Sequence, residues 1–265
     1  MSNFRSGDAQ LGYEVTGAGP DVVLLHPFPL HHHFWDGVLD QLATRYRVFL
    51  PDLRAHGDSE AGDGPVTMQK LADDLDRLCR EFEITRAIFV GVSIGGYTLF
   101  EFWRRHRERA RALVLANTRA GAETSEGRAT RLATAENVLR NGTAGFIEDL
   151  LPRLLSKATL ANRPDIVGAG RSMARKMSPA DIAAVQRGMA DRADSIPTLA
   201  TINVPTLVIA GEDDSVPLAE LELMHQRIAG SQLRLIAKAG HYAAMERPAE
   251  FGRILRGFLD AQPRD

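Results

Sequence analysis

Ile88-Phe-Val-Gly-Val-Ser-Ile-Gly-Gly-Tyr97 is the stretch that decides the fold. An apolar run over residues 87–90 ends in the glycine-flanked Ser93, and a helical pattern follows through Phe100 and Trp103. This is the order strand, sharp turn, helix, with a serine at the turn. In the spacing G-x-S-x-G, the residues two positions either side of the serine need to lack side chains because the turn is so tight. We therefore expect the Ser93 hydroxyl to stand clear of the sheet, beside backbone N–H groups at a helix N-terminus.

The composition limits what kind of protein this is. Of the 265 residues, 44% are hydrophobic and 25% are charged, which is typical of a globular protein, and the length fits one α/β domain. A net charge of −2 gives no reason to expect nucleic acid or a membrane as partner. The one cysteine, Cys79, lies on an apolar helical face and is expected in the core. With no apolar leader and no pair of cysteines, we expect a cytoplasmic protein.

The predicted strands are mostly short, continuous apolar runs, as strands buried on both faces should be. They span residues 11–15, 22–25, 46–50, 87–90, 112–116, 204–210 and 233–236. The first of them is expected to be antiparallel. Helices are predicted at residues 35–43, 67–82 and 248–259, and after Ser93. This alternation indicates a parallel sheet with right-handed crossovers.

The alternation stops between about residues 120 and 195. This region has helical periodicity and no convincing strand, and Pro152, Pro164 and Pro179 punctuate it. We interpret it as an inserted helical cap. The expected organisation is a first part of the core at residues 1–119, a cap at residues 120–195 and a second part of the core at residues 196–265.

Two polar loops follow strands late in the chain. Gly211-Glu-Asp-Asp-Ser-Val-Pro217 comes directly after one strand, and Ala239-Gly-His241 comes after the next. In open α/β sheets, the loops at the carboxyl ends of the strands build the site. Imidazole is a suitable base for a serine hydroxyl, and an acid can fix the tautomer of the imidazole. The chain order is therefore Ser93, then an acid, then His241.

With these motifs the chain resembles the α/β-hydrolase superfamily. The matching segments are Leu24-Leu-His-Pro-Phe28, Asp52-Leu-Arg-Ala-His-Gly-Asp-Ser59, Gly91-Val-Ser-Ile-Gly-Gly96, Gly211-Glu-Asp-Asp214 and Gly240-His241. The resemblance implies an α/β-hydrolase fold, with a mostly parallel central sheet flanked by helices and an inserted helical cap.

The resemblance also implies roles for single residues. Ser93 would be the nucleophile and His241 its base. The acid would be Asp214, three positions after the glycine, with the adjacent Asp213 as the alternative. The oxyanion hole would use the backbone N–H groups of Phe28 and Ile94. Proline precedes Phe28, where the family more often has glycine, but the donor is the residue after that position, so the missing proline N–H does not remove it.

Other histidines are expected to have structural roles. His31-His-His33 invites a metal interpretation, but three consecutive side chains fan outward and do not readily close on one ion. We therefore expect neither a metal nor another cofactor. His26 and His56 are expected to bond the loops around the strand ends, and Asp52 and Arg54 to hold their own loop by local hydrogen bonds.

A serine at the turn implies acyl transfer to water through an acyl-enzyme, since related dehalogenases and epoxide hydrolases need aspartate there. The segments around His26 and Arg54 resemble those of esterases and serine-type N-acyl-homoserine lactonases. We therefore expect a quorum-quenching lactonase with esterase activity, acting on a small ester or lactone with an apolar acyl arm. Some of the following cap residues could line a tunnel for that arm, although most should pack the cap: Leu150, Leu151, Leu154, Leu155, Ile166 and Met173.

Several alternatives stay open. The protein could be an enol-lactonase or a general carboxylesterase of small-molecule catabolism, a C–C hydrolase, or a perhydrolase that needs no cofactor. From another class, it could be a receptor of the same fold that binds a ligand without turning it over.

Overall fold

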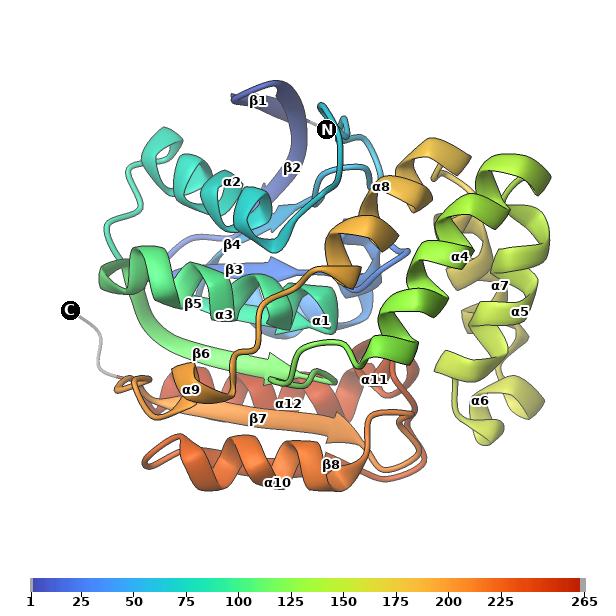
Figure 1. Ribbon diagram of the computed structural model, residues 1–265. Coiled ribbons are helices and arrows are strands. Elements are labelled where there is room, and N and C mark those ends of the chain that lie inside the picture. Colours follow the sequence, from blue (N-terminus) through green and yellow to red (C-terminus); the bar gives the residue numbers. More distant parts are fainter. Residues whose placement is uncertain (1, 263–265) are drawn as a thin grey trace.

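In the computed structural model, which describes residues 2–262, eight strands form one sheet in the order β1-β2-β4-β3-β5-β6-β7-β8 (Figure 1). The pairs β1–β2 and β2–β4 are antiparallel, and all other neighbours in the sheet are parallel. The strands are β1 (Ser2–Ser6), β2 (Ala9–Thr16), β3 (Asp21–Leu25), β4 (Arg47–Pro51), β5 (Ala87–Val92), β6 (Ala110–Ala116), β7 (Thr206–Gly211) and β8 (Gln232–Ile236). Every predicted strand is present. β1 is an addition that the sequence pattern did not indicate, because its only apolar residue is Phe4.

Helices cover both faces of the sheet. One face packs against α2 (Met68–Glu81), α3 (Ile94–His106) and α10 (Leu218–Arg227), and the other packs against α1 (Asp36–Leu42), α11 (Ala243–Glu246) and α12 (Pro248–Asp260). Shorter elements are the 3₁₀ turns η1 (His32–Trp35) and η2 (Arg107–Arg109), and α9 (Ile196–Leu199). Cys79 of α2 is fully buried, as predicted.

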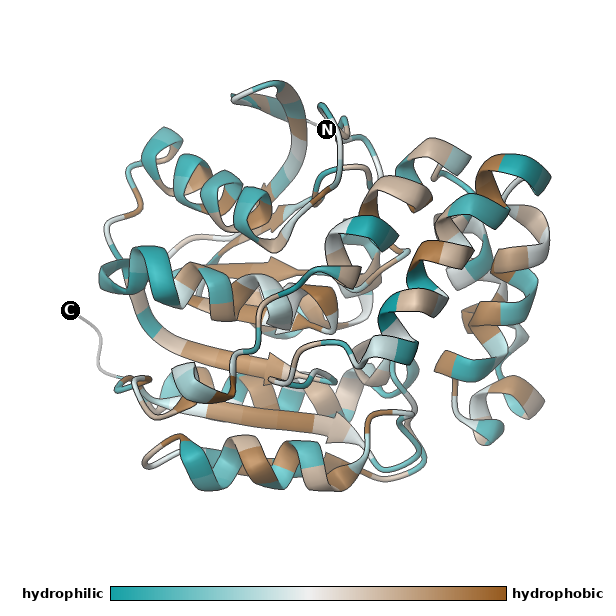
Figure 2. Cartoon of the chain, in the orientation of Figure 1, coloured by the Kyte–Doolittle hydropathy of each residue, from teal (hydrophilic) through white to brown (hydrophobic). Residues whose placement is uncertain are grey.

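The alternating side chains of each central strand divide the core into two clusters. Val23 and Phe89 belong to the cluster under α2 and α3, whereas Val22 and Val90 belong to the cluster under α1 and α12. Since successive residues of a strand point to opposite faces, a strand covered on both sides needs a continuous apolar sequence. Figure 2 shows the result, with hydrophobic strands lying between helices whose outer faces are hydrophilic.

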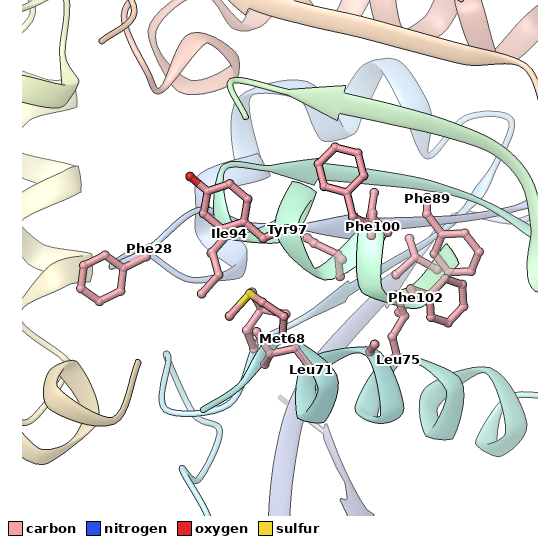
Figure 3. Packing of buried hydrophobic residues seen from close by; sticks show 14 of the residues in the cluster. Phe28, Met68, Leu71, Leu75, Phe89, Ile94, Tyr97, Phe100 and Phe102 are labelled. Carbon is pink, nitrogen blue, oxygen red and sulfur yellow. The ribbon is translucent and has the colours of Figure 1, made fainter. Parts of the chain in front are cut away.

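The first cluster extends beyond the sheet toward the site. Figure 3 shows Phe28 at one end of it, with Ile94 and Tyr97 between Phe28 and the α3 residues Phe100 and Phe102. The turn at Ser93 is therefore built on a rigid apolar base.

Five helices between β6 and β7 form what we call the cap. They are α4 (Ser125–Asn141), α5 (Ala144–Leu154), α6 (Lys157–Asn162), α7 (Pro164–Ala174) and α8 (Pro179–Ala190). α4 packs along α8, and α7 packs against α5 and α6. In Figure 1 the cap lies beyond the arrowheads of the parallel strands, at their carboxyl ends.

Local sequence explains how the cap helices begin. Pro164 and Pro179 occupy first-turn positions, where a missing N–H costs nothing, and Ser178 forms a capping box with Asp181. Pro152 lies inside the last turn of α5. Among residues 2–262, no helix is both long and apolar enough to span a bilayer.

Candidate active site

Ser93 occupies the turn between β5 and α3 in a conformation that few residues adopt. Its φ of 55° and ψ of −112° are strained for a residue with a side chain. A Cβ on Gly91 would lie 2.5 Å from the carbonyl carbon of Gly95, and a Cβ on Gly95 would lie 2.8 Å from the carbonyl oxygen of Leu25. Both glycines are therefore required by close approach, as the spacing predicts. Thr118 helps to hold the turn, since its hydroxyl donates to the Ser93 carbonyl at 2.9 Å.

His241 and Asp214 are brought together from loops after β8 and β7. Nδ1 of His241 lies 2.8 Å from Oδ1 of Asp214. Because a carboxylate only accepts hydrogen bonds, Nδ1 carries the proton and Nε2 is left as the free base. Burial raises the pKa of the Asp214 carboxyl, but the charge and hydrogen bond of His241 outweigh it, so this pKa lies below its usual value.

Asn117 is a partner of Asp214 that the sequence pattern did not reveal. Its side-chain amide donates to Oδ2 of Asp214 at 2.8 Å, and the Val216 N–H donates to Oδ1 at 3.1 Å. The side chain of Asp213, the alternative acid, is exposed. The backbone N–H of Asp213 donates to the Ala239 carbonyl oxygen. The hydrogen-bond network therefore converges on Asp214.

Ser93 and His241 line one partly open cavity of about 210 Å³, which is formed by residues of both the core and the cap. The other lining residues are Phe28, Tyr97, Arg119, Arg131, Leu150, Leu154, Gln186, Met189, Ser215 and Val216. Of the cap residues considered for an acyl tunnel, Leu150 and Leu154 reach this cavity. Leu151, Leu155 and Met173 are buried in the second core cluster.

The two expected oxyanion-hole donors are the backbone N–H groups of Phe28 and Ile94. Phe28 lines the cavity, and Ile94 is the first residue of α3, directly after Ser93. Among residues 2–262, neither N–H has a hydrogen-bond acceptor. The Tyr242 hydroxyl donates to the Phe28 carbonyl at 3.1 Å and so fixes the loop. Buried N–H groups are rarely left unpaired, which is consistent with a place for a substrate oxygen.

Two arginines, Arg119 and Arg131, line the cavity, and we call them the arginine wall. They belong to a cluster of three arginines around one acid. Glu123 accepts hydrogen bonds from Arg119, Arg131 and Arg192. The Arg192 guanidinium also stacks over the Tyr97 ring, 4.4 Å from its centroid. Burial raises the pKa of Glu123, but the arginines outweigh it and hold that pKa at about 2. This cluster was missed because the four charged residues form no local motif.

His26 bonds two loops, as predicted. Its Nε2 accepts from the Leu53 N–H at 2.9 Å, and its Nδ1 lies 3.1 Å from the Pro27 carbonyl oxygen. Burial lowers its pKa to about 3, so it stays neutral. His56 bonds the Arg54 carbonyl through Nδ1 at 2.7 Å.

His31, His32 and Asp52 form a cluster with the residue types of a metal site. One ligand atom of each lies within 4.8 Å of the others. The argument from consecutive histidines overlooked Asp52, which lies far from them in sequence. Its Oδ1 is 2.8 Å from Nδ1 of His32, and its Oδ2 accepts from the Asp58 N–H. Burial lowers the pKa of His32, but the hydrogen bond and charge of Asp52 outweigh it and raise that pKa.

Comparison with known proteins places the chain in a family. The family model described as the alpha/beta hydrolase fold matches residues 20–248. The chain belongs to the α/β-hydrolase family. The expected fold and the expected resemblance are thus confirmed.

Within the α/β-hydrolase family, similar proteins include esterases and lactonases. The chain is 30% identical to 3-oxoadipate enol-lactonase 1 of Acinetobacter baylyi, over 98% of this chain and 96% of that one. A thermophilic esterase from Thermogutta terrifontis, with malate bound, has 37% identity and a TM-score of 0.92, covering 95% of this chain and 93% of that one. Est816, described as an N-acyl homoserine lactone degrading enzyme, has 26% identity and a TM-score of 0.83, covering 97% of this chain and 100% of that one. The chain is accordingly a hydrolase of this family.

Proposed function

We propose that this hydrolase cleaves small carboxylic esters and lactones through an acyl-enzyme on Ser93. His241 is the base, and Asp214 orients it. The observation that carries the proposal is the hydrogen bond between Nδ1 of His241 and Asp214, which leaves Nε2 free on a ring that shares a cavity with Ser93.

The chemistry follows from these positions. Nε2 of His241 takes the proton of the Ser93 hydroxyl as its oxygen attacks the substrate carbonyl. The negative oxygen that forms accepts hydrogen bonds from the N–H groups of Phe28 and Ile94, where one donor is typically worth about 10²–10³ in kcat. His241 then gives its proton to the leaving alcohol. A water activated by the same histidine releases the acid and restores Ser93.

A lactone adds one requirement to this series of reaction steps. Its leaving alcohol stays attached to the acyl group, so water must reach the acyl-enzyme before the ring closes again. The cavity of about 210 Å³ supports a compact substrate over one with a long fatty acyl arm, and its polar lining groups suit a substrate that is partly polar. The similarity to an esterase and an enol-lactonase agrees with such substrates.

An N-acyl-homoserine lactonase is the second candidate. The similarity to Est816 favours it, as do Leu150 and Leu154, which offer an apolar wall for an acyl arm. A cavity of about 210 Å³ would take short acyl chains in preference to long ones.

The test compares hydrolysis of p-nitrophenyl butyrate with the opening of short- and long-chain N-acyl-homoserine lactones. A pH-stat measures the acid released in each reaction, with and without a chelator. Ester and lactone cleavage that the chelator does not change supports the proposal. Labelling with a fluorophosphonate, read by intact mass, should modify the wild type and spare Ser93→Ala. A folded wild-type protein that is neither labelled nor active would instead be a ligand receptor.

A further inference from the structure

We propose that the arginine wall of the cavity binds a second, ionised acid group of the substrate, so that the preferred substrates are esters or lactones that keep a free carboxylate. The inference rests on the proposed function for the reacting end of the substrate. It assigns the other end to Arg119 and Arg131.

The cluster carries an excess of positive charge. Arg119, Arg131 and Arg192 share the single carboxylate of Glu123, so three cations face one anion. The carboxylate of Asp214 is engaged by His241. Charges interact strongly where water is partly excluded, and an uncompensated excess in such a place favours an anionic ligand.

Arg119 and Arg131 have donors to spare. Arg131 uses Nε for Glu123 and Nη1 for Gln186, and within residues 2–262 its Nη2 has no acceptor. Arg119 uses Nη2 for Glu123 and also bonds Tyr97, yet a guanidinium has five N–H groups. Planar guanidinium groups match the two oxygens of a carboxylate, and Glu123 already holds both arginines in place.

Arg192 shows how a purely structural arginine differs in this cluster. Its side chain is 3% exposed, it donates to the Gly121 carbonyl, and it is stacked on Tyr97. By contrast, the side chains of Arg119 and Arg131 are 32% and 21% exposed, and both line the cavity that contains Ser93. The cluster thus places two partly open cations in the same cavity as the reacting serine.

The first test measures binding without catalysis. Glutarate, a dicarboxylate that cannot be hydrolysed, is titrated calorimetrically into Ser93→Ala. We expect saturable binding that weakens about tenfold or more when Arg131→Gln is added, since a hydrogen-bonded charge pair is lost. The control is Arg187→Gln, which removes the same charge from an exposed ion pair on α8 and should bind like Ser93→Ala alone. Absent binding, or equal loss in both variants, would overturn the subsite.

The second test measures selectivity with a matched pair of esters. Mono-p-nitrophenyl glutarate and p-nitrophenyl pentanoate have five-carbon acyl groups and differ in the terminal carboxylate. We expect wild type to prefer the anionic ester by about tenfold or more in kcat/KM, and Arg131→Gln to lose that preference while Arg187→Gln keeps it. Hydrolysis without preference would contradict the subsite and leave the proposed function standing. If neither ester is cleaved, the proposed function fails, and the glutarate titration still decides the subsite.

Discussion

The backbone N–H of His241 donates a hydrogen bond of 2.8 Å to the carbonyl oxygen of Leu154, so the loop that carries the histidine is tied to the last turn of α5. Glu246 strengthens the same junction. Its buried carboxylate accepts from the Ser156 N–H and from the Gly240 N–H, both at 2.9 Å. A Cβ on Gly240 would lie 2.6 Å from the Ser156 nitrogen. The position of the proposed base therefore depends on the cap.

Glu246→Gln should weaken this junction. An amide replaces one acceptor oxygen with a donor, which would face either the Ser156 or the Gly240 N–H and leave it unpaired. We expect the free energy of unfolding to fall by about 2 kcal/mol in urea titrations, the typical cost of a buried unsatisfied group. We also expect kcat to fall about tenfold or more, because His241 shifts. Glu222→Gln, on the exposed surface of α10, is the control. Unchanged stability of Glu246→Gln would show that the junction does not need the carboxylate.

Asp214→Asn and Asp213→Asn separate the two candidate acids. Asparagine at position 214 can offer an N–H to Nδ1 of His241, which stabilises the wrong tautomer and leaves Nε2 protonated. We expect kcat to fall by about 10³–10⁴, as in related arrangements. Asp213→Asn changes an exposed carboxyl and should stay within about twofold of wild type, as expected for an ordinary surface substitution. Steady-state rates with p-nitrophenyl butyrate decide the matter, and a larger loss at position 213 would reverse the assignment.

The strands could be predicted because a strand buried on both faces has a continuous apolar sequence. The turn at Ser93 could be predicted because close packing leaves no room for side chains at Gly91 and Gly95. The glycines are thus a local signal of a tertiary constraint. β1 could not be predicted in this way, because it is an edge strand with one apolar anchor, Phe4.

Much of the site depends on contacts between distant segments. Asn117 and Asp214 are 97 positions apart, and no local pattern joins them. Arg54 was expected to bond within its own loop, but its guanidinium binds Asp74 and Asp8. The fold brings the two partners of such a hydrogen bond together. In the sequence they are only isolated polar residues, which show no pattern that joins them.

Ser93→Gly should separate activity from stability. Backbone strain of this kind costs about 1–3 kcal/mol, and glycine relieves it while alanine does not. After the greater flexibility of glycine in the unfolded chain is subtracted, we expect Ser93→Gly to be more stable than Ser93→Ala by about 1 kcal/mol. Both variants should lose hydrolysis and fluorophosphonate labelling. Urea unfolding measures the difference, and an alanine variant as stable as the glycine variant would mean that the turn holds no such strain.

His26 should make the protein less stable in acid. Burial lowers its pKa from 6.5 to about 3 in the folded protein. As the pH falls below 6.5, the unfolded chain binds a proton at this side chain before the folded protein does. Stability from the neutral imidazole is therefore complete above about pH 6.5 and is lost as the pH falls toward 3. His32, whose pKa is raised, acts in the opposite direction.

His26→Gln tests this pH dependence. The glutamine oxygen can accept from the Leu53 N–H in place of Nε2, and glutamine does not titrate. We expect the variant to be less stable at pH 7, since it fills the buried site less well. Between pH 6 and 4, its free energy of unfolding should fall less steeply than that of wild type, by up to about 1.4 kcal/mol per pH unit, the slope for one proton. The contribution of His32 is the same in both proteins and cancels. Urea titrations at several pH values provide the measurement, and parallel curves would show that His26 is not the group whose protonation is linked to unfolding.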